Sequence, residues 1–356
     1  MQRILDPAQI EAFAERDIPR VRLPDPAVFR SRAARLSACA DRHALRDYLL
    51  LMAAVTNAQQ GEFDSLRAAL TAENFAGQLG RQIEVAREHG MPVLQAAEWP
   101  RQDRWRDVLR GLCSVIATGT PSLQPTARGT SPLRFPPIVY ELCVRLAATS
   151  DADLDAQADL LITGRIEVIG AQNTEGAGGT EGADAVHGTG GAHGTQGVDA
   201  QAAPFIMAAL QVYWAAMAST LRLTDVAQLD VPTVCPVCGT LPVASVVRSD
   251  KRGPQGYRYL HCGLCETEWH SVRITCSHCL STEGITYHSI EGGSEAIRAE
   301  ACGKCHTYRK ILYQEKDSSV EPVADDLSSL ALDLLMTDEG FHRASGNPLL
   351  WQTSET

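Results

Sequence analysis

The sequence predicts an α+β protein: an all-α N-terminal domain, two tandem small β-rich modules, and a C-terminal helix. Apolar residues recur at helical spacing through the first part of the chain, four Cys-x-x-Cys pairs lie in the last third, and a repeat relates those pairs two by two. We expect boundaries at 1–230 for the helical domain, 231–274 and 275–316 for the two modules, and 317–356 for the C-terminal helix and tail.

The first 170 residues are expected to fold as helices. Asp6-Pro7 and Asp25-Pro26 each combine an N-cap residue with a proline at the first helical position. Gly90 suits the left-handed position that follows a helix. Apolar spacing predicts helices over 28–40, 41–60, 75–89, 105–116 and 139–146. Few segments alternate with period two, so an all-helical domain is the simplest interpretation.

Residues 170–203 are rich in glycine and contain no Leu, Ile or Phe. Such a segment cannot bury enough apolar surface to offset the entropy lost on ordering, so we expect a flexible insertion. Its histidines, His187 and His193, are not expected to share a metal. A helix over 205–223 follows and is apolar on most sides, which places it back in the helical domain. The alternative is that the glycine-rich segment links two separate domains.

Charge and hydropathy argue against a nucleic-acid-binding, secreted or membrane-spanning protein. The formal net charge of −11 gives a polyanion no overall electrostatic attraction, which argues against a nucleic-acid partner. The N-terminus has no signal-peptide pattern, and the most apolar stretch, 202–221, reads as a buried helix and not as a membrane span. We therefore expect a cytoplasmic protein, in a reducing compartment where cysteines more often bind metals than form disulfides.

Eleven cysteines are present. Cys39, Cys113 and Cys143 lie singly in apolar helical stretches, where cysteine acts as a small hydrophobic residue. The other eight form the pairs Cys235/Cys238, Cys262/Cys265, Cys276/Cys279 and Cys302/Cys305. A single Cys-x-x-Cys is a weak signal, but four close together are a strong one. A two-residue gap in a tight turn brings two sulfurs onto one ion, and two such turns complete a tetrahedral site.

The repeat assigns the four pairs to two sites. Cys235-x-x-Cys238 overlays Cys276-x-x-Cys279 after a shift of 41 residues. Arg258-x-x-x-Cys262-Gly263-x-Cys265-x-Thr267 overlays Arg298-x-x-x-Cys302-Gly303-x-Cys305-x-Thr307 after a shift of 40. Each copy is expected to hold one metal ion. The first site is Cys235, Cys238, Cys262 and Cys265, and the second is Cys276, Cys279, Cys302 and Cys305. The alternative is a cross-braced arrangement that joins the first pair to the third and the second to the fourth.

The segments around the cysteines are expected to form short strands. Residues 243–247, 257–260, 269–274, 285–290 and 308–313 are rich in β-branched and aromatic residues. Basic residues that would offset the negative charge of the first site are Arg248, Lys251, Arg252, Arg258 and Arg273, and those for the second are Lys304, Arg309 and Lys310. The alternative for each is an ordinary solvated side chain. Five nearby histidines (His261, His270, His278, His288, His306) are expected to stay outside the sites, because eight cysteines already complete two shells.

No catalytic motif accompanies the cysteines, and a site saturated by four thiolates leaves no position for a substrate. We therefore do not expect an enzyme. Three classes remain: a metal-stabilised accessory protein, a nucleic-acid-binding zinc ribbon, and a redox protein such as an electron carrier. Four-sulfur tetrahedral ligation suits zinc and iron alike, so the ligands alone leave the metal open.

Several runs of residues resemble the family of formate dehydrogenase accessory proteins called FdhE. They are Tyr257-Arg-Tyr-Leu-His-Cys-Gly-Leu-Cys-Glu-Thr-Glu-Trp-His270, Lys310-Ile-Leu-Tyr-Gln-Glu-Lys-Asp317, Val323-Ala-Asp-Asp-Leu327, Ala203-Pro-Phe-Ile-Met-Ala-Ala-Leu-Gln-Val-Tyr-Trp214 and Asn347-Pro348. The resemblance spans nearly the whole chain and includes all four cysteine pairs. The departure is 170–203, which is long and glycine-rich for this family.

The resemblance implies a helical domain followed by two rubredoxin-like or zinc-ribbon modules, with iron favoured over zinc in two sites per chain. It implies a cytoplasmic, non-catalytic role in maturing formate dehydrogenase, through contact with its catalytic subunit before twin-arginine export. The segment 313–317 is expected either to contact that partner or simply to end a strand before a helix over 325–336. A homodimer is compatible with the sequence, which does not set the oligomeric state.

Overall fold

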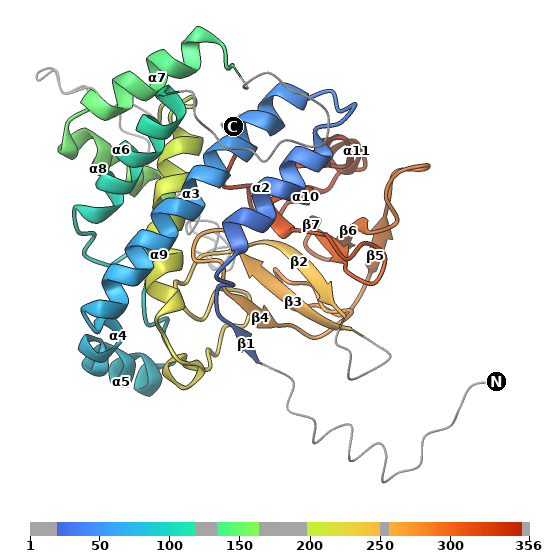
Figure 1. The fold of residues 1–356 in the computed structure, drawn as a ribbon. Helices are drawn as coiled ribbons and strands as arrows, with labels where there is room; N and C mark the ends of the chain where they lie inside the picture. The colour runs from blue at the N-terminus through green and yellow to red at the C-terminus, as the bar shows by residue number, and fades with distance from the viewer. Residues whose placement is uncertain (1–19, 119–133, 164–197, 250–255, 351–356) are drawn as a thin grey trace, which may run out of the picture.

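The computed structural model describes residues 20–118, 134–163, 198–249 and 256–350, and it joins a layer of helices to one mixed β-sheet (Figure 1). Several predictions lie outside the described residues. They are the helix start at Asp6, most of the insertion at 170–203 with His187 and His193, and the basic residues Lys251 and Arg252.

The helical layer confirms the predicted all-α part of the chain. Its helices are α2 (Val28–Cys39), α3 (Arg46–Ala72), α4 (Phe75–Gln78), α5 (Gly80–His89), α6 (Arg104–Ala117), α7 (Pro137–Ala148), α8 (Asp151–Thr163) and α9 (Ala203–Ser219). Helix α3 continues past the predicted end at residue 60, because Phe63, Leu66 and Leu70 keep the helical spacing of buried side chains. Gly90 ends α5 with φ of +59°, as its sequence predicts.

Helix α9 is the centre of this layer. Every side chain from Ala203 to Ala218 is buried, and α9 packs against α3, α6 and α8. This confirms that the helix returns to the helical layer after the glycine-rich segment. It ends at Ser219, short of the predicted residue 223, and a 3₁₀ turn (Leu223–Asp225) follows.

The sheet contains both copies of the cysteine repeat. Its strands are β1 (Val21–Arg22), β2 (Pro242–Arg248), β3 (Tyr257–Cys262), β4 (Glu268–His270), β5 (Ile285–His288), β6 (Ile297–Cys302), β7 (Thr307–Tyr313) and β8 (His342–Arg343). The order is β1-β4-β3-β2-β7-β6-β5, with β8 beside β7. Each copy is an antiparallel set of three strands, and the parallel pairing of β2 with β7, Ser245 opposite Ile311, joins the copies. The sequence missed β6 because its buried positions include Glu300 between alanines.

The C-terminal part forms two short helices where the sequence predicts one over 325–336. Helix α10 (Pro322–Ser328) and α11 (Leu330–Asp338) are separated at Ser329, whose backbone leaves the helical region. Helix α10 packs against α2 and β2. Strand β7 ends at Tyr313, as the strand-end interpretation of 313–317 expects, and a role of this segment in partner contact stays a prediction. No helix of the described residues has the length and apolar character that a membrane crossing requires.

Candidate metal centres

The eight predicted cysteines come together in two groups of four. Cys235, Cys238, Cys262 and Cys265 form the first cluster, and Cys276, Cys279, Cys302 and Cys305 form the second. Within each cluster the four sulfurs lie within 4.8 Å of one another. The grouping is the sequential one predicted by the repeat and not the cross-braced alternative.

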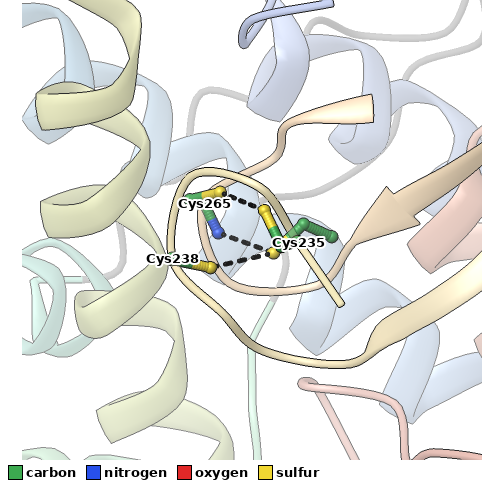
Figure 2. A group of neighbouring side chains, drawn as sticks. Cys235, Cys238 and Cys265 are labelled. Carbon is green, nitrogen blue, oxygen red and sulfur yellow. Dashed lines mark hydrogen bonds between the residues drawn. The ribbon is translucent and has the colours of Figure 1, made fainter. Parts of the chain in front are cut away.

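Sulfur spacing is that of a metal site. In the first cluster Sγ of Cys235 lies 3.4 Å from Sγ of Cys265 (Figure 2). Sγ of Cys238 lies 3.4 Å from Sγ of Cys262. The corresponding separations in the second cluster are 3.7 Å for Cys276 with Cys305 and for Cys279 with Cys302. Four sulfurs at about 2.3 Å from one ion are about 3.8 Å apart, whereas a disulfide needs about 2.05 Å. The donor set and its spacing therefore fit a tetrahedral thiophilic ion in each cluster.

The backbone makes the same turn at all four cysteine pairs. The residue after each second cysteine has positive φ: Gly239 (80°), Glu266 (62°), Leu280 (62°) and His306 (55°). Only one of these four residues is a glycine, so three of the four positions accept the conformation with a side chain. The turn directs backbone N–H groups at sulfur. Those of Leu264 and Cys265 donate to Cys262 Sγ, each at 3.3 Å, and His278 and Cys279 do the same to Cys276 Sγ at 3.4 Å.

A hydroxyl residue stands two positions after each second cysteine, at Thr240, Thr267, Ser281 and Thr307. Thr240 Oγ1 lies 3.2 Å from the sulfurs of both Cys238 and Cys262. Thr267 Oγ1 is 3.2 Å from Cys265 Sγ, and Thr307 Oγ1 is 3.1 Å from Cys305 Sγ. The hydroxyls of Thr240 and Thr307 can stabilise thiolates by donating a hydrogen bond to them, whereas Cys265 Sγ donates to Thr267. The sequence pattern that could have located these hydroxyls is Cys-x-x-Cys-x-Ser/Thr. The repeat comparison had aligned only Thr267 with Thr307.

The first cluster is sealed by the helical layer. All four of its cysteines are fully buried, and they share one apolar core with α9. The backbone N–H groups of Leu94 and Ala96 donate to the carbonyls of Val237 and Cys238 at 2.8 and 2.9 Å. Gln211 of α9 donates from Nε2 to the carbonyl of Gly263 at 2.8 Å. Both cysteine turns of this cluster are thus hydrogen-bonded to the helical layer.

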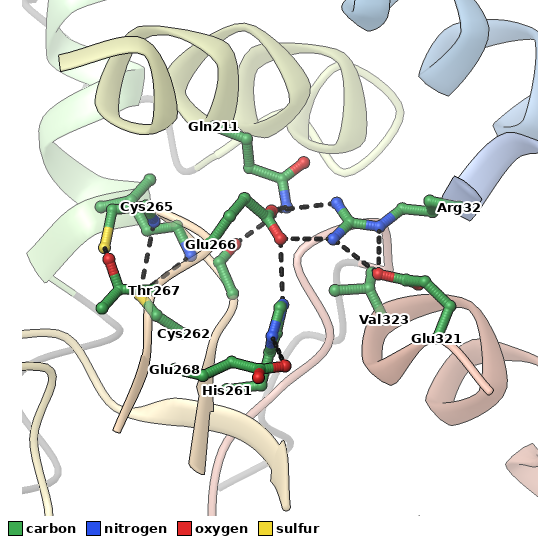
Figure 3. Close-up of polar contacts among 12 residues, drawn as sticks. Arg32, Gln211, His261, Cys262, Cys265, Glu266, Thr267, Glu268, Glu321 and Val323 are labelled. Atoms are coloured by element: carbon green, nitrogen blue, oxygen red, sulfur yellow. Dashed lines mark hydrogen bonds and ion pairs between the residues drawn. The ribbon is translucent and has the colours of Figure 1, made fainter. Parts of the chain in front are cut away.

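A buried charge network adjoins the first cluster (Figure 3). Arg32 of α2 donates from Nη1 to Glu266 and from Nε to Glu321, both at 3.0 Å. His261 lies 2.9 Å from Glu266 through Nε2 and 3.3 Å from Glu268 through Nδ1. Burial lowers the pKa of His261, but hydrogen bonds to these two carboxylates outweigh it and raise the pKa to about 9.

The geometry of His261, Glu266 and Glu321 also suits a cation. Arg32 already occupies that role, because its guanidinium lies between the two carboxylates. Protonated His261 and Arg248, which is ion-paired with Glu268, supply two further positive charges. Arg22 also forms an ion pair with Glu268, at 3.3 Å, so four cations contact three carboxylates and this group needs no ion of its own. Sequence reasoning had no signal for Arg32, since its partners lie far along the chain.

The second cluster lies near the surface. Cys276 and Cys302 are buried, but Cys279 and Cys305 are only half-buried. Behind the cluster, Arg309 is buried and donates from Nε to Ser277 at 2.8 Å and from Nη1 to Ser345 at 2.7 Å. Its Nη2 atom has no hydrogen-bond partner, and among the described residues no carboxylate forms an ion pair with it.

Arg309 has no ion-paired carboxylate as counter-charge in the part of the chain that the structure describes. Four thiolates around a divalent ion would carry a net negative charge and would supply that counter-charge. Burial, and then the positive charge of Arg258, lower the pKa of Arg309 to about 9, while the cluster's Cys276 acts in the opposite direction. The other predicted counter-charges behave differently. Arg258 pairs with Glu300 at 2.6 Å and Lys310 with Asp333 at 2.6 Å, so these cations neutralise carboxylates and not the sulfurs.

Comparison with known proteins gives one family for the whole chain. The FdhE N-terminal family model matches residues 18–174, the FdhE central domain matches 234–273, and the FdhE C-terminal domain matches 274–350. The chain is 37% identical to a protein FdhE homolog of Cronobacter sakazakii and 36% identical to protein FdhE of Salmonella paratyphi A, in each case over 91% of this chain and 88% of the relative.

A solved structure agrees with these matches. The crystal structure of the FdhE protein from Pseudomonas aeruginosa superposes with a TM-score of 0.70 at 28% identity, and it covers 93% of this chain and 99% of that one. The N-terminal family model covers helices α2 to α8, the other two models each cover one cysteine cluster, and α9 lies between the matched ranges. The chain belongs to the FdhE family.

Proposed function

We propose that the chain is a non-catalytic, metal-binding accessory protein that serves the maturation or activity of formate dehydrogenase. The observation that carries the proposal is the pair of four-cysteine clusters in a chain of the FdhE family. Each cluster offers four sulfurs to one ion, so a bound ion has no open position for a substrate. A role in binding or electron transfer fits such a site better than catalysis does.

The ligands in this proposal are the eight clustered cysteines, with one ion in each cluster and iron favoured over zinc. Iron in a four-thiolate site would supply one-electron chemistry, whereas zinc would supply only structure. Elemental analysis of anaerobically purified protein should give two metal ions per chain, and one or none would refute the two-site assignment. Oxidised iron should absorb visible light, and a colourless protein with two zinc ions would correct the metal.

The proposed partner is the catalytic subunit of formate dehydrogenase, bound in the cytoplasm before twin-arginine export. Capture of that subunit by the tagged, metal-loaded chain tests this directly. We expect capture to weaken when Cys279→Ser removes a ligand of the second cluster. Val144→Asp, an exposed substitution on α7 far from either cluster in the fold, is the control. Tight, salt-sensitive binding of DNA or RNA without capture of the subunit would favour a nucleic-acid-binding zinc ribbon instead.

We also propose the division into 1–230, 231–274, 275–316 and 317–356 as units of the chain. The internal repeat and the separate family models for the central and C-terminal domains support it. Limited proteolysis that cuts within a unit, outside the expected insertion at 170–203, before it cuts between units would overturn the division. Light scattering at increasing concentration would test for a homodimer.

A further inference from the structure

We propose that the two clusters differ in access: metal enters and leaves through Cys279 and Cys305 of the second cluster, while the first cluster stays closed. This proposal rests on the metal-binding function proposed above and assigns different tasks to two sites with the same ligands. The acceptor or donor would be a small thiol or chelator, or a protein that presents soft sulfur ligands.

Exposure separates the clusters residue by residue along the repeat. The residues within the turns of the first cluster, such as Val237 and Leu264, are fully buried. At the corresponding turns of the second cluster, Gly303 and Lys304 are exposed and His278 is half-buried. Leu280, which follows Cys279, is 48% exposed. An incoming ligand can therefore reach the second cluster from solvent without displacing any folded segment.

Opening the first cluster requires the helical layer to move. Its turns are held by the backbone bonds from Leu94 and Ala96 and by the side-chain bond from Gln211. Residues 94–96 and Gln211 together cover the first cluster. Trp214 of α9 holds residue Leu94 in place, since its Nε1 donates to the carbonyl of Leu94 at 3.2 Å. Access to the first ion therefore needs local unfolding, which has a free-energy cost that the second cluster does not share.

The second cluster can exchange two of its ligands while keeping the other two, because Cys276 and Cys302 are buried whereas Cys279 and Cys305 are half-buried. Cys302 is the last residue of β6, and Cys276 is buried in the turn beside Ser277, which accepts a hydrogen bond from the buried cation of Arg309. With an ion bound, Cys279 Sγ would give up its bond to the ion as the sulfur of an incoming thiol formed one, and the proton of that thiol would pass to Cys279. Cys305 would follow by the same exchange. Each bond broken would be replaced by one bond formed, with no transfer of electrons.

Metal release from the full, zinc-loaded chain tests the proposal. With 4-(2-pyridylazo)resorcinol as the chelator, we expect one equivalent to leave quickly and the other more than about tenfold more slowly. Iodoacetamide labelling read by mass spectrometry should modify Cys279 and Cys305 before any cysteine of the first cluster. Equal rates, or earlier labelling of the first cluster, would overturn the proposal. A total metal content below two would instead count against the proposed function.

Two variants assign the phases without removing the first cluster. Cys305→Ser should abolish the fast phase and leave the slow one unchanged. Gln211→Ala removes one bond of the cover and should accelerate only the slow phase, while Gln82→Ala, an exposed glutamine on α5, should change neither. Acceleration of the fast phase by Gln211→Ala would contradict the assignment of that phase to the second cluster.

Discussion

The two copies of the cysteine repeat have the same ligands and the same turns, but they lie in different surroundings. The first copy is enclosed by α9 and by residues 93–96, and its buried charges reach across to α2 through Arg32. The second copy faces solvent on one side. One of its charge networks joins Lys310 and Arg343 to Asp326 and Asp333, and Glu300 pairs with Arg258 of the first copy, so none of these ion pairs reaches the N-terminal helices. The ligand motif therefore specifies the ion-binding geometry. The packing around the motif decides whether a bound ion would stabilise the fold or remain accessible to solvent.

Matched cysteine substitutions provide the largest expected difference between the copies. Cys262 and Cys302 hold the same position in the repeat and are both buried. A structural ion contributes roughly 10 kcal/mol or more of binding free energy, which is lost with its site. Cys262→Ser should therefore abolish cooperative unfolding of the helical layer, followed by circular dichroism, whereas Cys302→Ser should lose one metal ion and keep the helices. Equal damage from both changes would remove the distinction between the copies.

Arg32→Ala should be the next most damaging change. It leaves Glu266 and Glu321 buried without their cation, and breaking a buried pair in this way costs about 3–5 kcal/mol. Arg30→Ala, two residues away on the exposed side of α2, breaks only a long surface pair with Asp64 and should cost about 0–1 kcal/mol. Urea unfolding measures both. A cost for Arg32→Ala within the range of the control would mean that the network does not anchor the first copy.

Arg309→Met tests whether the buried Arg309 is a counter-charge for the second cluster alone. Removing an unpaired buried cation should raise the melting temperature of the metal-free chain. It should also weaken metal binding at the second cluster by about 10- to 100-fold, because the thiolates lose their nearest counter-charge. Lys304→Met, at an exposed position, should do neither. Competition with a chelator of known affinity measures the binding, and a fall in affinity at the first cluster would be the contradictory result.

The smallest expected effect concerns Ile274, which precedes the second cluster. This β-branched residue has φ of +58° and is 61% exposed, so its backbone is strained with little burial in return. Ile274→Gly should stabilise the chain by about 1 kcal/mol. Val272→Gly, at a similarly exposed residue without positive φ, should give no gain. Calorimetry of both variants measures the difference, and destabilisation by Ile274→Gly would show that its side chain makes a needed contact.

Local signals carried most of what the sequence predicted. Helical spacing located α2, α3, α6 and α7, and the 40-residue repeat grouped the cysteines as the structure does. The features that the sequence did not predict are contacts between residues far apart in the chain. No local pattern shows that Arg32 will meet Glu266 and Glu321, that Gln211 will bond to Gly263, or that β2 will pair with β7. Such contacts depend on how whole layers pack, and they are what makes the two clusters unlike.

The strand order has a consequence for synthesis on the ribosome. Val21 of β1 pairs with Trp269, and β2 finds its parallel partner only when β7 has been made. The helices emerge first, and α9 must wait with its apolar surface uncovered until residues 235–265 leave the exit tunnel. If the first cluster binds an ion as proposed, loading of that ion is the event that ends this exposure. A cell short of metal would accumulate nascent chains with a finished helical layer and no lid, which are natural clients for chaperones and proteases.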